Sequence, residues 1–194
     1  MTFDAPGPSS LTSESSPEHN FLAHPEVNAN VFLALRGTHL EQFVNYDTLL
    51  KAQDDRGFWA SYFYPSPLFA TLLALDVMHG KPAFASATER ALSFIIGSQN
   101  ADGSWGADSD PYETALAVAA LAGDPADTAA MRGGIEHLLS TMAGDGSWTS
   151  RACIWEFQAN EQDVWRAYDT HRAFVSACCM IGLRRAAGQL APFP

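Results

Sequence analysis

The chain has 194 residues, of which 47% are hydrophobic and 11% aromatic, a composition typical of a globular domain with a sizeable core. Its 22 acidic and 11 basic residues give a formal net charge of -11, and Lys and Arg form no continuous stripe. The charge therefore argues against binding to nucleic acid or to an anionic membrane surface, and mildly against a polyanionic ligand such as a diphosphate.

The sequence shows no sign of a membrane or secretory protein. No apolar run reaches the roughly 18 residues that a membrane span requires, and the first ten residues lack the order of a signal peptide. The cysteines are Cys153, Cys178 and Cys179, an odd number with two adjacent in a helical pattern, which does not suggest a disulfide framework. We therefore expect a soluble, cytoplasmic protein with reduced cysteines.

Residues 1–22 are rich in Ser, Pro and Glu and poor in large apolar side chains, so we expect a disordered N-terminal arm. A single folded domain is expected over 23–190. Within it, apolar residues recur at helical spacing in segments separated by Gly, Pro, Asp and Ser. The predicted helices cover 25–37, 39–53, 66–79, 83–98, 111–122, 128–142 and 168–186.

Three tryptophans each follow a glycine by two positions. They are Trp59, Trp105 and Trp148, in QDDRGFW, QNADGSW and MAGDGSW, and they lie 46 and 43 residues apart, which is the period of a helical hairpin repeat. The glycines can supply a positive φ after a helix, and Gln53 or Gln99 can bond to backbone ends. We therefore interpret the tryptophans as structural clamps over helix junctions and not as contacts with substrate.

The pattern QxxDGSW before an apolar helix resembles the QW repeat of the superfamily of class II terpene cyclases, squalene-hopene cyclases and prenyltransferases. Three segments are similar to the half of a class II terpene cyclase catalytic domain that follows the Asp-x-Asp-Asp motif. They are HPEVNANVFLAL, GFWASYFYPSPLFAT, and DGSWG followed by YETALAVAAL. The resemblance covers residues 24–186 and implies an all-α fold, a partial α/α-toroid of about seven helices.

The resemblance also implies a function: binding of an apolar isoprenoid or polyene in an aromatic-lined cavity and promotion of a carbocationic cyclisation, without a cofactor. Class II cyclases protonate the substrate with the middle Asp of Asp-x-Asp-Asp, a motif that this chain lacks. The nearest string places Tyr112 at that position, and a phenol with a reference pKa near 10 is too weak an acid. Glu113 or Asp110 could be the acid; alternatively, Asp110 caps the helix and Glu113 lies favourably against its dipole.

Aromatic residues are the predicted contacts with substrate, because aromatic faces stabilise a carbocation by cation–π attraction. Two of them stand where the family segment has Lys and His, which favours an uncharged substrate over a diphosphate. Ordinary core packing is the alternative for all of them. The predicted substrate-binding residues are Tyr62, Tyr64, Phe69, Tyr112, Trp155, Phe157, Trp165, Tyr168 and Phe174.

Two polar residues, Asp169 and His171, lie at the start of the last predicted helix. Asp169 could cap this helix or take part in catalysis. His171 could be the base that removes a proton from the final cation, or a structural residue. His171 and Cys178 share a helix face, distantly similar to zinc ligands of protein prenyltransferases, but no upstream Asp has that family's spacing. We therefore expect no metal site.

The length of the chain bears on its assembly. A closed toroid of six hairpins needs about 270 residues at the observed period, so we expect an open arc whose inner helices need a partner. That partner would be a second copy of the chain or another chain carrying the rest of the toroid. Two further functions stay open: a non-catalytic subunit that completes the cavity of a partner cyclase, and a repurposed toroid acting on a non-terpenoid natural product.

Overall fold

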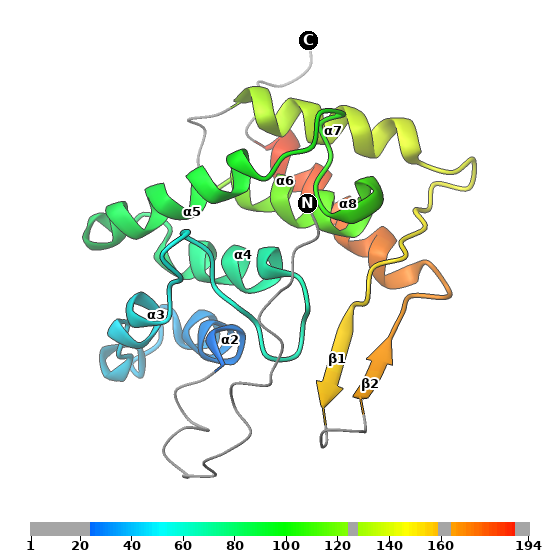
Figure 1. Ribbon diagram of the computed structural model, residues 1–194. Helices are drawn as coiled ribbons and strands as arrows, with labels where there is room; N and C mark the ends of the chain where they lie inside the picture. The colour runs from blue at the N-terminus through cyan, green and yellow to red at the C-terminus, as the bar shows by residue number, and fades with distance from the viewer. Residues whose placement is uncertain (1–23, 124–127, 159–163, 189–194) are drawn as a thin grey trace.

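The computed structural model describes residues 24–123, 128–158 and 164–188, so the expected arm over 1–22 lies outside the described residues. The described part contains seven α-helices and one small β-hairpin (Figure 1), which confirms the predicted all-α class and a partial α/α-toroid. The helices are α2 Pro25–Leu35, α3 Asp47–Lys51, α4 Pro67–Met78, α5 Ala85–Gly97, α6 Pro111–Leu121, α7 Thr128–Thr141 and α8 Ala173–Ala187. Short 3-10 helices cover Glu41–Phe43, Pro82–Phe84 and Ala107–Ser109.

The helices form two layers. In the inner layer α2 packs on α4, α4 on α6 and α6 on α8, while α3, α5 and α7 lie outside them (Figure 1). Helix α6 is at the centre, and its side chains from Tyr112 to Leu121 are buried, except for a partly exposed Glu113. Its many buried alanines let the neighbouring helices approach closely, and burial of each large aliphatic side chain, such as Leu116, contributes about 1.5–3 kcal/mol.

The inner helices α4 and α6 begin in the same way. Each has proline as its first residue, where the missing N–H leaves no intrahelical bond unmade. The preceding residue caps the helix: the Ser66 hydroxyl accepts the N–H of Leu68, and the Asp110 carboxylate accepts the N–H groups of Tyr112 and Glu113. Two polar caps are thereby placed at the same end of two neighbouring inner helices.

The three Gly-x-Trp turns have one geometry. The indole N–H of each tryptophan donates to a carbonyl ten residues earlier at 2.7 Å, on Leu49, Ile95 and Leu138 respectively. The backbone N–H of each tryptophan donates at 3.0 Å to a hydroxyl of the following inner helix, on Thr71, Thr114 and Ser176 respectively. All three tryptophans are buried, so they clamp each outer helix to the next inner one, as interpreted from the sequence.

Two of the predicted helices differ from the structure, one in its middle and one at its start. The segment predicted as a helix over 39–53 is interrupted by an extended residue, Val44, and only α3 and a 3-10 helix form. The helix predicted over 168–186 begins at Ala173, because Arg172 has a left-handed φ of 61° that an α-helix cannot contain.

A β-hairpin precedes α8 and was not predicted. Strand β1, Trp155–Gln158, pairs antiparallel with β2, Val164–Ala167, and Phe157 lies opposite Trp165 in the register. The backbone N–H of Glu156 donates to the carbonyl of Phe63 at 2.8 Å, so the hairpin is tied to the loop before α4. The hairpin thereby stands beside the N-terminal ends of the inner helices (Figure 1).

Helix α8 ends the described arc and has two different faces. Val175 and Cys179 are buried, in keeping with the packing of α8 on α6, whereas Phe174, Met180 and Ile181 are 42%, 58% and 52% exposed. The three cysteines are free. Within the described ranges, no helix has the length and apolar character needed to cross a membrane.

Candidate functional site

Glu113 is the polar side chain at the junction of α4 and α6. The Ser66 hydroxyl, which caps α4, donates to Glu113 Oε2 at 2.6 Å. Glu113 also lines a cavity of about 510 Å³ at the start of α6. The described residues lining this cavity are Pro65, Ala107, Asp108, Asp110, Pro111, Glu113, Thr149, Arg151, Ala152 and Cys153.

Burial raises the pKa of the Glu113 carboxyl to about 7, against an ordinary value of 4.5. The hydrogen bond from Ser66 opposes this shift, and the charge of Asp110 adds to it. A carboxyl group with a pKa near neutrality holds its proton in a substantial fraction of molecules and can still release it, which is the property of an efficient general acid.

Asp110 has a different environment, because donors engage both of its oxygens. Oδ1 accepts the N–H groups of Tyr112 at 2.9 Å and Glu113 at 3.4 Å, and the Ser150 hydroxyl at 2.9 Å. Oδ2 accepts the Ser150 hydroxyl at 2.8 Å and the Arg151 N–H at 3.2 Å. Asp110 therefore caps α6 and ties segment 150–151 to it, whereas among the described residues Glu113 has one hydroxyl donor, Ser66.

The turn before α6 is strained. Gly106 has a φ of 82°, and the non-glycine residues Asp108 and Ser109 have φ values of 53° and 56°. A left-handed conformation costs about 1–2 kcal/mol for such residues. A Cβ atom on Gly106 would lie 2.5 Å from Cγ of Glu113, so this turn packs directly on the Glu113 side chain. Strain of this kind clusters at functional sites.

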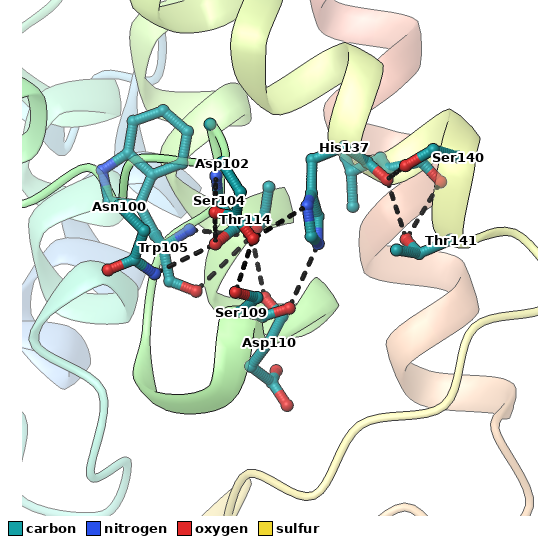
Figure 2. A network of polar contacts seen from close by, with 12 residues as sticks. Asn100, Asp102, Ser104, Trp105, Ser109, Asp110, Thr114, His137, Ser140 and Thr141 are labelled. Carbon is teal, nitrogen blue, oxygen red and sulfur yellow. Dashed lines mark hydrogen bonds and ion pairs between the residues drawn. The ribbon is translucent and has the colours of Figure 1, made fainter.

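A network of polar contacts holds the strained turn (Figure 2). Asp102 Oδ1 accepts the N–H and the hydroxyl of Ser104 at 3.1 and 2.6 Å, and Oδ2 accepts the Ser109 hydroxyl at 2.6 Å. His137 on α7 lies with Nδ1 3.6 Å from Asp102 Oδ2 and Nε2 3.1 Å from the Ser109 carbonyl. Hydrogen bonds from Ser104 and Ser109 lower the pKa of Asp102 to about 2.

Sequence reasoning missed this network. Asp102 belongs to the repeated DGSW pattern, so nothing in the sequence indicated a further contact of its carboxylate with Ser109. His137 lies far from this motif in the chain.

The predicted aromatic residues gather in pairs at the same end of the inner helices. Tyr64 stacks on Phe69 with ring centroids 3.9 Å apart, and Tyr112 lies 5.9 Å from Phe174. Trp155 stacks on Phe63 at 6.4 Å, and Phe63 contacts Tyr62 edge to face at 4.8 Å.

The remaining aromatic residues lie further out. Trp165 and Tyr168 are 64% and 52% exposed, and the backbone of Phe157 lies in β1. None of the predicted aromatic residues is among the described residues that line the cavity at Glu113. The structure therefore brings the two predicted acids together, and it brings six of the aromatic residues into ring contacts near the same helix ends.

Tyr112, which the sequence resemblance placed at the position of the class II cyclase acid, is fully buried on α6. Its hydroxyl has no hydrogen-bond partner within the described part of the chain. Burial raises the pKa of the Tyr112 phenol above its ordinary value of 10.0, so this group does not release a proton near neutral pH.

The other predicted polar residues lie at the start of α8. Asp169 Oδ2 accepts the N–H of Val175, in the first turn of α8, at 2.8 Å, and His171 is exposed. Neither is among the described residues that line the cavity at Glu113. Ranges 24–123, 128–158 and 164–188 contain no group of three or more His, Cys, Asp or Glu that could hold a metal ion.

Several solved structures are similar to this one. A protein from Actinoplanes has 28% identity and a TM-score of 0.72, over 84% of this chain and 55% of its own. The type II terpene cyclase MstE from Scytonema has 19% identity and a TM-score of 0.73, over 92% of this chain and 61% of its own. The ent-copalyl diphosphate synthase from Streptomyces platensis has 20% identity and a TM-score of 0.62, over 91% of this chain and 34% of its own.

No protein-family model matches the chain, and no curated protein matches it significantly. The chain spans 55% and 61% of the lengths of the Actinoplanes protein and MstE. Variants of MstE are known in complex with the substrate geranylgeranyl dihydroxybenzoate and with the product merosterolic acid A. Together with the two layers of helices and the three repeated turns, these similarities show that the chain has the fold of the class II terpene cyclases.

Proposed function

We propose that the protein is a terpene-cyclase-like enzyme in which Glu113 protonates an apolar isoprenoid or polyene and so starts a carbocationic cyclisation. The observation that carries this proposal is the protonatable Glu113 carboxyl at a cavity between two helix N-termini. In the first step the O–H bond of Glu113 breaks, a C–H bond forms on an alkene carbon, and the alkene electron pair leaves a cation on the neighbouring carbon. The final cation then loses a proton to water, the electron pair of the broken C–H bond forms a new alkene, and the Glu113 carboxylate regains a proton from water.

Ser66 defines which oxygen of Glu113 donates. Because the Ser66 hydroxyl donates to Oε2 at 2.6 Å, Oε1 is the oxygen that can carry the acidic proton. The same hydrogen bond stabilises the carboxylate that remains after proton transfer, since a charged acceptor strengthens it. Ser66 therefore supports the release of the proton while burial supports its retention.

The charges around the cavity favour an uncharged substrate head. Asp108, Asp110 and Glu113 line it together with one cation, Arg151, among the described lining residues. A diphosphate would meet net negative charge there and is disfavoured. The aromatic pairs lie at the same helix ends but outside the described lining of this cavity. A substrate that extends past the cavity would bring the migrating cation to their faces, at about 0.5–2 kcal/mol per desolvated ring.

The test uses a substrate of known chemistry. The purified chain is incubated with geranylgeranyl dihydroxybenzoate, with geranylgeraniol and with a linear non-terpenoid polyene, and isomers of unchanged mass are separated by chromatography and identified by mass spectrometry. We expect conversion of an isoprenoid and a loss of at least 100-fold in Glu113→Gln, because the amide keeps the shape but not the acidic proton. Asp145→Asn, remote from the cavity lining, is the matched control. Unchanged conversion in Glu113→Gln would refute the assignment of the acid.

A second candidate function is a non-catalytic or incomplete subunit that closes a cavity with another chain. The exposed apolar residues Phe174, Met180 and Ile181 on α8 favour it, because each preceding inner helix packs on the next. The expected partner is a second copy or a chain carrying the rest of the toroid. If the partner is a second copy, light scattering gives about twice the 21.0 kDa of one chain, and Ile181→Lys dissociates the dimer. Turnover by an isolated monomer would reject this candidate.

A further inference from the structure

We propose that Asp102 and His137 are positioning residues that hold the Gly106–Ser109 turn against the Glu113 side chain and so close one side of its cavity. The inference deepens the proposed function and rests on it only for the role of Glu113 as an acid. The contacts themselves belong to the structure: Asp102 lies in the second Gly-x-Trp turn and His137 on the outer helix α7. Neither residue lines the cavity within the described part of the chain.

The turn directly contacts the Glu113 side chain. An added Cβ on Gly106 would lie 2.5 Å from Cγ and 2.7 Å from Cβ of Glu113, and 3.5 Å from Cβ of Asp110. The backbone of the turn therefore covers the aliphatic part of the Glu113 side chain. Ala107 and Asp108 continue from this contact into the wall of the cavity. A displaced turn would expose Glu113 to water.

The turn needs support from side chains outside it. Asp108 and Ser109 both adopt left-handed backbone conformations, which their side chains disfavour. Contacts hold the turn at both ends. At its end, Ser109 donates its hydroxyl to Asp102 and its carbonyl lies 3.1 Å from His137 Nε2. At its start, Asn100 Nδ2 donates to the Gly106 carbonyl at 2.9 Å. Figure 2 shows these side chains converging from the turn and from α7.

The third Gly-x-Trp turn contains an aspartate equivalent to Asp102. Asp145 occupies the position of Asp102 in the third turn, and its Oδ1 accepts the N–H and hydroxyl of Ser147 at 3.1 and 2.5 Å. Its Oδ2 accepts from the side chain of Arg172 at 3.1 Å and makes no contact with the Gly106–Ser109 turn among the described residues. Asp145 therefore makes the local half of the contacts of Asp102 without the half that reaches Ser109. It provides a matched control.

The measured quantity is the titration midpoint of Glu113. The charged or titratable groups around it are Tyr112 and Asp110 on and beside α6, Asp108 in the turn, and Arg151 and Cys153 in the facing segment. None of them is altered by the variants Asp102→Asn, His137→Asn and Asp145→Asn. A change in the midpoint therefore reports the covering of Glu113 and not the loss of a neighbouring titratable group that faces it.

The experiment is carbon NMR of the full chain with labelled glutamate carboxyl groups, with Glu113→Gln used to assign the signal. In the natural sequence we expect a midpoint near 7, and in Asp102→Asn and His137→Asn a fall of at least one pH unit towards 4.5, because water reaches the carboxyl. Asp145→Asn leaves the midpoint unchanged. Ser109→Ala removes one hydroxyl and keeps both Asp102 and His137, and it should move the midpoint in the same direction. It replaces Asp102→Asn in the test if that variant does not fold.

An unchanged midpoint in the folded variants, or an equal shift in Asp145→Asn, would overturn the proposal. A midpoint near 4.5 in the natural sequence would overturn it too, since Glu113 would then not be covered. The measurement needs no substrate, so it stands apart from the proposed function. Shifted midpoints together with full turnover in Glu113→Gln would support the positioning role and reject Glu113 as the acid.

Discussion

The second and third Gly-x-Trp turns have nearly the same sequence, but the segments that follow them differ in structure. Trp105 and Trp148 make the same indole hydrogen bond of 2.7 Å, and both are buried. After Trp105 the chain enters a strained turn that covers Glu113, whereas after Trp148 it leads to the β-hairpin. The repeat therefore supplies a rigid junction between helices, and the residues directly after it determine the local chemistry.

The two turns also differ in how they meet the next outer helix. Gln99 Nε2 donates at 2.9 Å both to the Gly103 carbonyl and to the Ala130 carbonyl at the start of α7. Met142 stands at the corresponding place in the third turn and is 44% exposed. The second turn is therefore enclosed by helices, and the third lies at the open end of the described arc.

The largest effect is expected for Trp105→Ala and Trp148→Ala. Both indoles are buried and both donate a hydrogen bond, so each truncation should lower the free energy of unfolding by about 3–5 kcal/mol. Urea denaturation followed by circular dichroism measures it, with Trp165→Ala, 64% exposed, as a control that changes little. If Trp148→Ala were tolerated, the third turn would not be a clamp equivalent to the second.

Gly103→Ala and Gly146→Ala separate backbone strain from packing. Both glycines have positive φ values, 86° and 79°. A Cβ on Gly103 would lie 2.7 Å from the Gly133 carbonyl oxygen, whereas a Cβ on Gly146 meets nothing within 4 Å. We expect a loss of about 3–4 kcal/mol for Gly103→Ala and about 1 kcal/mol for Gly146→Ala, measured by thermal unfolding. Equal losses would show that the second turn is not packed against α7.

The pH dependence of stability tests the burial of Glu113, which the strained turn after Trp105 covers. Because burial raises the pKa of Glu113 from 4.5 to about 7, the folded state binds its proton more tightly than the unfolded state. Its contribution is therefore present below pH 4.5 and is lost as the pH rises to about 7, by up to about 3 kcal/mol.

Asp145 in the third turn titrates in the opposite direction to Glu113, as does Asp102 in the second turn. Hydrogen bonds from Ser147 lower the pKa of Asp145 below its ordinary value of 3.8, so its contribution is lost as the pH falls below that value. Denaturation of the natural sequence and of Glu113→Gln at several pH values measures the difference. A Glu113→Gln curve that still falls between pH 4.5 and 7 as steeply as the natural one would show that another group is responsible.

The smallest effect is expected at the glutamine position. Gln99→Ala leaves two carbonyls without their donor and should cost about 1 kcal/mol. Met142→Gln places the same side chain in the third turn, where it is partly exposed, and should change the free energy of unfolding by less than about 0.5 kcal/mol. Chemical denaturation measures both. A large gain in Met142→Gln would mean that the third turn also meets a helix.

The repeat is the part of the fold that could be predicted from the sequence. The spacing of Trp59, Trp105 and Trp148 is a long-range periodicity, and it indicated helical hairpins before any contact was known. The β-hairpin was missed although Trp155, Phe157, Trp165 and Ala167 alternate with polar residues, because each strand has only four residues and aromatic residues also suit a helix.

The candidate site was predictable only in part. Asp110 and Glu113 stand one helical turn apart in the chain, so a shared helix start could be inferred from the sequence. The hydrogen bond from Ser66 joins residues 47 positions apart, and the carbonyl of Ser109 in the left-handed turn contacts a histidine from α7, 28 positions further along the chain. Tertiary contacts of this kind leave no periodic signal in one sequence.

The repeated indole hydrogen bond has a consequence for how the chain folds. Each of the three bonds joins residues ten positions apart, so it closes a short loop at small entropic cost. By contrast, the ion pair between Arg185 on α8 and Asp76 on α4 joins residues 109 positions apart. Since local contacts form faster than distant ones, folding has three independent starting points along the chain. The ion pair between α4 and α8 forms after them, when the inner helices have assembled.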